Sequence, residues 1–135
     1  MNISEIKPKE LSLIEPWWEH DQTPHYEQPK ASTLKIQNRH TFLAWQEQKP
    51  IALLETEFTK TCTYIGIVIE PEVRNCGRGK KVLWEFMQLK IFADTKKFVA
   101  GIDPQNKISQ RLFESMGFTY ETTDKDGILD YVWIK

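Results

Sequence analysis

The chain has 135 residues, the usual size of one domain, and its 40% hydrophobic and 12% aromatic residues can build one core. Its formal net charge of -1 gives no overall attraction to nucleic acid or to an anionic membrane. Charges occur throughout residues 1–15, and no apolar run approaches the roughly 18–20 residues of a bilayer span. We therefore expect a single domain over residues 1–135, with no nucleic-acid or membrane partner.

Cysteine and histidine are too scattered to indicate a metal site. Cys62 and Cys76 form no C-x-x-C motif, and the histidines show no spacing typical of metal ligands. We predict no metal, two free thiols and a reducing, cytoplasmic location.

The first third of the chain is irregular. Prolines up to residue 29 keep helices short, so we expect only a strand at 2–7 and a short helix at 11–20. From residue 41 the patterns are clearer. Residues rich in β-branched and aromatic side chains predict strands at 41–46 and 51–58, and the nearly all-apolar segment 63–69 predicts a strand buried on both faces.

Helical signals dominate the next part. Residues 79–94 lack proline and repeat apolar side chains at helical spacing, which predicts a long helix. A strand at 98–102 precedes a second helix, which Asn106 caps and Gly117 ends in the left-handed conformation. We expect this second helix to bury Ile108, Leu112 and Met116, and we assign Trp45, Trp84 and Trp133 to the core.

This order of elements predicts an α+β (mixed α/β) fold. Strands at 118–122 and 129–134 form a final hairpin. The long helix between strands 63–69 and 98–102 is a crossover, so we expect those two strands to be the single parallel pair in a mostly antiparallel sheet flanked by helices.

The segment RNCGRGK, from Arg74 to Lys80, lies between a buried strand and a helix. The first N–H groups of a helix have no partner within the helix, and the helix dipole is positive there. Gly77 and Gly79 let the backbone approach an anion, while Arg74, Arg78 and Lys80 add positive charge. The segment therefore predicts a turn that binds pyrophosphate.

Two other phosphate-binding motifs do not fit this segment. A Walker A loop needs glycine where Arg74 stands and serine or threonine where Lys81 stands. A dinucleotide-binding fingerprint needs a third glycine, and Val82 occupies its place. What is left is the pattern R-x-x-G-x-G, preceded by the residues Ile69-Glu70-Pro71-Glu72.

This pattern resembles motif A of the GCN5-related N-acetyltransferase (GNAT) family, V-x-P-x-x-R/Q-x-x-G-x-G/A. The stretch from Asn106 to Phe118 is similar to motif B of the same family, N-x-x-A-x-x-L-Y-x-x-x-G-F, with Ser109 and Phe113 as the departures. The two motifs are separated by the helix and strand that the family has between them. On this joint order the chain is identified as a member of the family over residues 41–135.

The resemblance implies that acetyl-CoA is the cosubstrate and that an amine attacks its thioester directly in a ternary complex. The pantetheine arm would lie where the two parallel strands diverge, and the backbone N–H of Val68 or Ile69 would polarise the thioester carbonyl. The cofactor-binding residues implied are Ile67, Val68, Ile69, Arg74, Asn75, Cys76, Gly77, Arg78, Gly79, Lys80 and Asn106.

The proton donor and the base are open. The family often has a tyrosine that acts as the acid where this chain has Phe113, so another group must protonate the thiolate or it leaves unassisted. The candidate donors are Tyr64, Ser115, Tyr120 and water. Glu55 is a candidate base, although it alternates with apolar neighbours as a surface residue would, and we expect Glu70 and Glu72 to face solvent. A covalent role for Cys76 is not expected, because no histidine lies nearby in sequence.

Residues 11–28 are acidic and aromatic, with four carboxylates and neither lysine nor arginine. Such a surface attracts cationic amines, and the candidate acceptor-binding residues are Trp17, Trp18, Glu19 and Tyr26. The alternative is a solvated acidic segment whose tryptophans are anchored in the core.

The sequence is compatible with two other functions to different degrees. The absence of the motif B tyrosine is compatible with a non-catalytic module that binds acyl-CoA or regulates a partner. A nucleic-acid-binding domain that uses the basic turn is disfavoured by the net charge. Edge strands of such small domains can pair, so a homodimer is left open.

Overall fold

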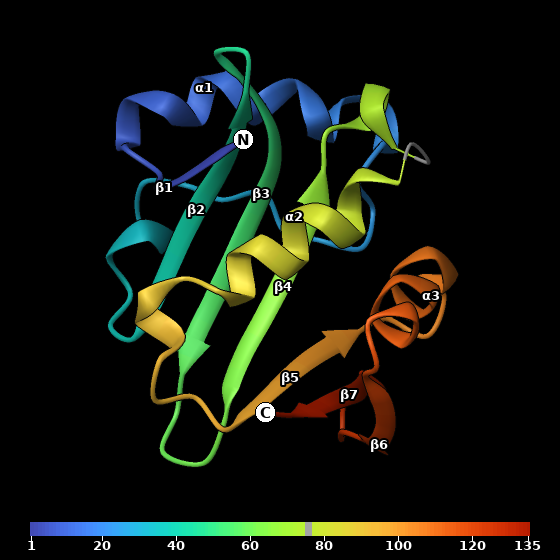
Figure 1. The fold of residues 1–135 in the computed structure, drawn as a ribbon. Helices are drawn as coiled ribbons and strands as arrows, with labels where there is room; N and C mark the ends of the chain where they lie inside the picture. Colours follow the sequence, from blue (N-terminus) through green and yellow to red (C-terminus); the bar gives the residue numbers. More distant parts are fainter. Residues whose placement is uncertain (75–76) are drawn as a thin grey trace.

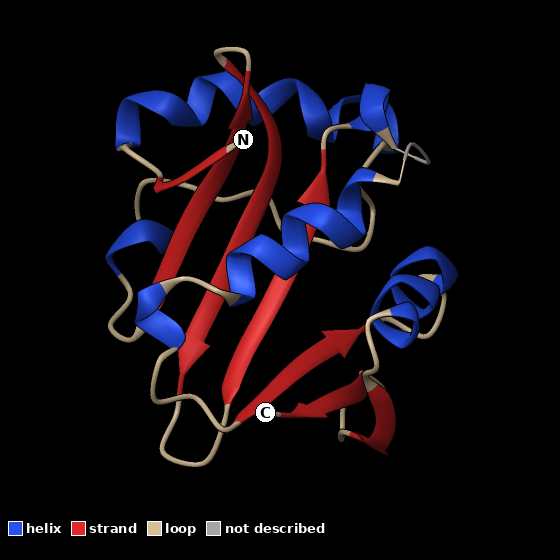
Figure 2. Ribbon diagram, viewed as in Figure 1, coloured by secondary structure: helices blue, strands red, loops and turns tan. Residues whose placement is uncertain are grey.

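The structure, a computed structural model, describes residues 1–74 and 77–135. Its described part contains one seven-stranded sheet with helices on both faces (Figures 1 and 2) and the strand order β1-β2-β3-β4-β5-β7-β6. The strands are β1 (Asn2–Glu5), β2 (Arg39–Gln46), β3 (Lys49–Phe58), β4 (Thr63–Ile69), β5 (Lys97–Ile102), β6 (Thr119–Thr123) and β7 (Leu129–Ile134). The helices are α1 (Leu11–Ile14), α2 (Arg78–Met87) and α3 (Lys107–Ser115), with short 3-10 turns at Pro8–Glu10, Glu15–Asp21, Thr33–Lys35, Pro71–Val73 and Lys90–Phe92.

The predicted fold class is confirmed. Only β4 and β5 pair in parallel, and in the described chain their register holds just two pairs, Thr63 with Phe98 and Tyr64 with Val99. Beyond these pairs the two strands diverge (Figure 1), which leaves the carboxyl-terminal half of β4 without a strand on that side. The gap in the sheet is therefore set by where the parallel pairing stops.

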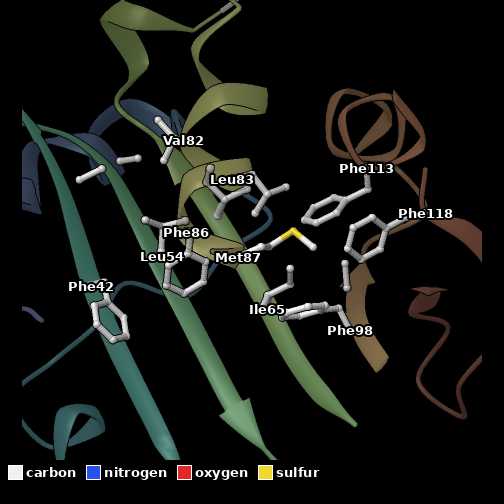
Figure 3. Close-up of a cluster of buried hydrophobic side chains, with 14 of the residues drawn as sticks. Phe42, Leu54, Ile65, Val82, Leu83, Phe86, Met87, Phe98, Phe113 and Phe118 are labelled. Carbon is white, nitrogen blue, oxygen red and sulfur yellow. The ribbon is translucent and has the colours of Figure 1, made fainter. Parts of the chain in front are cut away.

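The larger core fills the face of the sheet that α2 crosses. Val82, Leu83, Phe86 and Met87 point from α2 onto β3, β4 and β5 (Figure 3). Phe113 of α3 is fully buried in the same core. Its ring centroid lies 5.0 Å from that of Phe118.

The opposite face of the sheet is covered by the amino-terminal segment. Trp17 and Ile14 are buried there against Leu43, Leu53 and Val68 of the three central strands. The Trp18 ring stacks on that of Trp17, at 6.5 Å between ring centroids. This packing favours the second of the two interpretations of the segment, in which the tryptophans anchor it in the core.

Three sequence predictions about the core are wrong. The helix expected over residues 79–94 ends at Met87, because Leu89 adopts an extended backbone before a separate 3-10 turn. Trp84 is 52% exposed, since it lies on the face of α2 opposite the buried quartet. Ile108 is 65% exposed, although Leu112 and Met116 pack as expected.

The ends of the predicted elements are otherwise close. The final strand matches residues 129–134, Gly117 has the expected positive φ of 97°, and the first strand is shorter than predicted, ending at Glu5. Trp45 and Trp133 are half-buried and pack against the two cores. Within the described chain, no helix has the length and apolar character needed to cross a membrane.

Candidate active site

A cavity of about 540 Å³ opens beside the carboxyl end of β4, where β5 has turned away. Four segments distant in sequence line it: the end of β4, the turn and first residues of α2, the first turns of α3, and residues 22–26 of the amino-terminal segment. We call residues 22–26 the cleft-spanning segment. The lining includes Tyr26, Ile67, Ile69, Arg74, Gly79 and Ser109.

The start of α2 has the features of an anion site. Gly77 is its N-cap, with a φ of 74°. A glycine has no side chain to cap the first turn, so this residue leaves the N–H groups there able to bind a ligand. A Cβ on Gly79 would lie 3.3 Å from Leu112 Cδ2, so only a glycine lets α2 and α3 approach this closely without adjustment. Arg78 and Lys80 also line the cavity, while Asn75 and Cys76 fall outside the described residues.

Arg74 links the turn to the cleft-spanning segment. Its Nε donates to the Ile69 carbonyl at 2.8 Å, and its two terminal nitrogens donate to the Gln22 carbonyl and, at 2.9 Å, to Thr23 Oγ1. Burial lowers the pKa of Arg74, and the nearby Glu70 carboxylate opposes that shift. A direct contact of Arg74 with pyrophosphate therefore stays a prediction, whereas its hold on residues 22–23 is observed.

Glu70 is not solvent-facing, contrary to the sequence prediction. It is 5% exposed because the 3-10 turn that follows β4 folds back over it. One oxygen accepts from the Glu72 N–H at 3.3 Å, and the other lies 3.9 Å from Lys49 Nζ. The carboxylate thus caps the turn that leads to the anion site.

Asn106 caps α3 as predicted. Its Oδ1 accepts from the Ser109 N–H and its Nδ2 donates to Ser109 Oγ, both at 3.1 Å. Ser109 Oγ lies 3.5 Å from the Tyr26 hydroxyl, and either group can donate. The start of α3 is thereby connected across the cavity to the cleft-spanning segment.

The backbone amides of β4 point alternately toward β3 and toward the cavity. Glu70 N–H donates to the Ile51 carbonyl at 2.9 Å, and in an antiparallel ladder every second residue repeats that pairing. The register therefore directs the amide of Val68 toward Leu53 of β3. The backbone amides of Ile67 and Ile69 face the open side, so the register favours Ile69 over Val68 as the thioester donor, and that role stays a prediction.

The predicted proton donors do not line the cavity. Tyr120 is 54% exposed on β6, where its hydroxyl pairs with Thr123 Oγ1 at 2.8 Å. Ser115 donates to the Leu112 carbonyl on the surface, and the exposed Tyr64 lies outside the lining. The sequence prediction of Tyr120 as the acid is therefore not supported by its position.

Glu55 is not a simple surface residue. It is half-buried on β3 directly opposite Gly66 of β4. Burial raises its pKa, Arg39 opposes the shift, and Glu27 adds to it. A carboxyl whose pKa is raised is a suitable base, but Glu55 itself does not line the cavity.

Of the four candidate acceptor residues, only Tyr26 reaches the cavity. Trp17 is in the core, Trp18 donates from Nε1 to the Tyr26 carbonyl at 2.8 Å, and Glu19 is exposed outside the lining. The sequence analysis missed Ser109 and Thr23 as parts of the site. No local pattern identifies them, because their partners lie more than 50 residues away along the chain.

Among the described residues, no three or more His, Cys, Asp and Glu side chains come together as a group able to hold a metal ion. The site geometry is instead that of a cleft with a positive helix terminus at one end and exposed strand amides along one wall.

Comparison with known proteins agrees with this geometry. The sequence profile described as the acetyltransferase (GNAT) family matches residues 8–118. A curated relative, the uncharacterized N-acetyltransferase YfmK of Bacillus subtilis (strain 168), is 31% identical over 136 residues, which cover 94% of this chain and 92% of the relative. The chain therefore belongs to the GNAT family and is an acetyltransferase.

Solved structures share the fold. A domain from Methanocaldococcus jannaschii DSM 2661 superposes with a TM-score of 0.82 at 19% identity, covering 99% of this chain and 97% of that one. The aminoglycoside acetyltransferase AAC(6')-Ib in complex with coenzyme A superposes with a TM-score of 0.83 at 16% identity, covering 99% and 94%. At such identities the likeness concerns the fold.

Proposed function

We propose that this acetyltransferase moves the acetyl group of acetyl-CoA to a primary amine by direct attack in a ternary complex. The observation that carries the proposal is the cavity itself, which joins a basic helix terminus to the exposed amides of β4. Related folds support the cosubstrate, since AAC(6')-Ib was crystallised both with coenzyme A and with acetyl-CoA.

The residues present fit such a cosubstrate. The first turn of α2 has a glycine N-cap with no capping side chain, and it suits a pyrophosphate together with the positive charges of Arg78 and Lys80. From there an extended arm would follow β4 past Ile69 to Ile67, where its amides could pair with the open side of the strand. When bound, acetyl-CoA supplies an activated acyl group and a thiolate leaving group.

The chain's own groups perform the remaining chemistry. The outward amide of Ile69 donates to the thioester oxygen and stabilises the negative charge that develops there as the amine attacks. Because this amide belongs to a strand held by β3 on its other side, it needs little reorganisation. Glu55, with its raised pKa, is the proposed base and would act through water, because it stands one residue position away from the cavity wall.

The proposed acceptor is a cationic amine. Glu27 from the amino-terminal segment acts on Glu55, and the nearby Arg39 is paired with Glu57 at 3.3 Å between Nε and Oε1. Three carboxylates against one guanidinium leave this part of the sheet with negative charge. AAC(6')-Ib, which shares the fold, was crystallised with the amine-rich kanamycin. Polyamines, aminoglycosides and peptide amino termini are the classes to test first.

The test measures release of free thiol from acetyl-CoA in the presence of a panel of such amines. We expect thiol release with at least one amine and a rise in melting temperature with coenzyme A alone. If coenzyme A produced neither a thermal shift nor any turnover, the proposal would be wrong.

One alternative has a specific observation behind it. At the position where the family often has tyrosine, this chain has Phe113, which carries no hydroxyl and is fully buried in the core. A non-catalytic acyl-CoA-binding module would show the thermal shift without thiol release on any amine. A cytoplasmic location and a homodimer stay predictions.

A further inference from the structure

Tyr26 is the one tyrosine among the described cavity-lining residues. It reaches the cleft from the amino-terminal segment, 83 positions away in sequence from Ser109, its partner on α3. Its ring lies over the bare backbone of β4: a Cβ on Gly66 would sit 3.8 Å from Tyr26 Cε1, in ordinary van der Waals contact. The phenol oxygen is thus held between β4 and α3.

We propose that Tyr26 is a catalytic residue that donates the proton to the coenzyme A thiolate as it leaves, in place of the tyrosine absent at position 113. The inference rests on the proposed function. It deepens that function by assigning the acid, for which the sequence offered only residues that lie outside the cavity.

The position of Tyr26 along the cleft supports this role. β4 runs from its pairing with β5 at Tyr64 toward the anion site, so Ile67 is about 6–7 Å deeper in the cleft than Ile69. The Tyr26 hydroxyl is at the level of Ile67, whose backbone faces it. A cosubstrate held by its phosphates at α2 would therefore bring its acyl end, and not its middle, toward this hydroxyl.

The backbone of Tyr26 is fixed on several sides. Trp18 Nε1 donates to its carbonyl at 2.8 Å, and the preceding His25 Nδ1 lies 3.8 Å from Asp103 Oδ2 at the end of β5. Arg74 holds Gln22 and Thr23. The hydroxyl is consequently presented by a segment anchored on both sides of the cleft, which suits a group that must meet a sulfur atom in one geometry.

The protonated phenol is favoured at this place. Burial raises the pKa of Tyr26, and the Glu55 carboxylate on β3 adds to the shift, while Ser109 and the Ile67 backbone oppose it. The charged or titratable groups that line the cleft beside Tyr26 are His25, Arg74, Arg78 and Lys80 of the turn and α2, and Lys107 of α3. Behind the wall, Glu55 of β3 acts on the phenol, and Glu27 and Arg39 act on Glu55. A phenol with a raised pKa is protonated at neutral pH and so can act as an acid.

The step balances without a further reactant. The neutral amine forms its N–C bond to the thioester carbon, the C–S bond breaks with its electron pair on sulfur, and the phenol proton moves to that sulfur. The phenolate then takes a proton from the nitrogen of the new amide. The products are the N-acetyl amine, free coenzyme A thiol and an unchanged Tyr26.

The first test replaces Tyr26 with phenylalanine and uses the amine identified by thiol release. We expect kcat to fall on the order of 100-fold, the lower end of the range for a lost general acid. Coenzyme A affinity, measured by calorimetry, should be unchanged, and Tyr120→Phe should have normal kcat. Unchanged kcat in Tyr26→Phe would overturn the inference, as would parallel loss of affinity and kcat. Absence of thiol release by the wild-type protein would instead refute the proposed function.

A second test separates acid catalysis from packing. A fluorinated tyrosine at position 26 keeps the ring but ionises at lower pH, so the alkaline fall in kcat should move to lower pH. The same substitution at position 120 is the control. The ¹⁹F resonance at position 26 should also shift when coenzyme A is added, a readout independent of turnover. An unmoved alkaline limb, or a resonance insensitive to coenzyme A, would contradict the proposal.

Discussion

The two walls of the cavity are built in different ways. One consists of β4, α2 and α3, regular elements whose backbones are fixed by a sheet ladder and helical hydrogen bonds over the larger core. The other is the cleft-spanning segment, residues 22–26, which belongs to no strand or helix and is held by a few side-chain contacts distant in sequence. The regular wall offers backbone groups for a cosubstrate, and the irregular wall offers side chains.

Binding of the cosubstrate and choice of the acceptor therefore depend on different parts of the molecule. A site for the invariant part of a cosubstrate can be built from backbone, because strand amides and helix termini have the same geometry whatever the side chains. Side chains such as Tyr26, delivered by an irregular segment, can vary without disturbing the sheet. The predictions below test whether the two walls can be altered separately.

The largest expected effect is on the regular wall. Phe86→Ala removes a fully buried ring between α2 and the sheet and should lower the free energy of unfolding by about 3–5 kcal/mol. Urea denaturation followed by tryptophan fluorescence or circular dichroism measures it. The matched control on the same helix is Trp84→Ala, which should stay within about 0.5 kcal/mol of wild type because Trp84 is exposed. Equal losses in both variants would show that the assigned face of α2 is wrong.

Next comes the anion site of that wall. Gly79→Glu places a negative charge in the first turn of α2, and juxtaposed like charges cost several kcal/mol, so coenzyme A affinity should fall by roughly two orders of magnitude. Gly79→Gln has nearly the same size without the charge and should lose less. Calorimetric titration with coenzyme A compares them. Wild-type affinity in the glutamate variant would count against pyrophosphate binding at α2.

A smaller effect is expected where the two walls meet. Arg74→Gln removes charged hydrogen bonds to Gln22 and Thr23, and one to the Ile69 carbonyl at the very end of β4; each such bond contributes about 1.5–3 kcal/mol at most. Amide hydrogen exchange should rise in residues 22–26 while β4 stays protected. Exchange that rises equally in both would mean that the walls are not independent.

The smallest effect is a pH dependence of stability through Glu55. Burial raises its pKa in the folded protein above the ordinary 4.5. The folded state therefore holds its proton to higher pH than the unfolded state, so this group's contribution is present below pH 4.5 and is lost as pH rises through the folded pKa. Glu55→Gln should flatten the fall in stability over that interval. Urea midpoints from pH 4 to 8 measure the slope, and an unchanged slope would argue against the buried carboxyl.

Most of the regular wall could be predicted from local sequence patterns. Alternation and helical spacing predicted the strands and the order of elements, and Gly77, Gly79 and Asn106 predicted the helix starts, because these signals depend on neighbours a few residues away. These patterns misplaced Trp84 and Ile108, since an apolar residue does not reveal which side of a helix the rest of the chain will cover.

The irregular wall, and the direction of the groups that face the cleft, depend on long-range packing and could not be predicted from local patterns. The register of β4 against β3 directs the backbone amide of Val68 toward β3 and that of Ile69 toward the cavity, and no local pattern records that register. The sequence already made Tyr26 a candidate for binding the acceptor. Its place between Gly66 and Ser109 depends on a contact with a residue 83 positions later in the chain, which no local pattern predicts. Local sequence encodes what an element is, whereas long-range packing decides which of its groups meet.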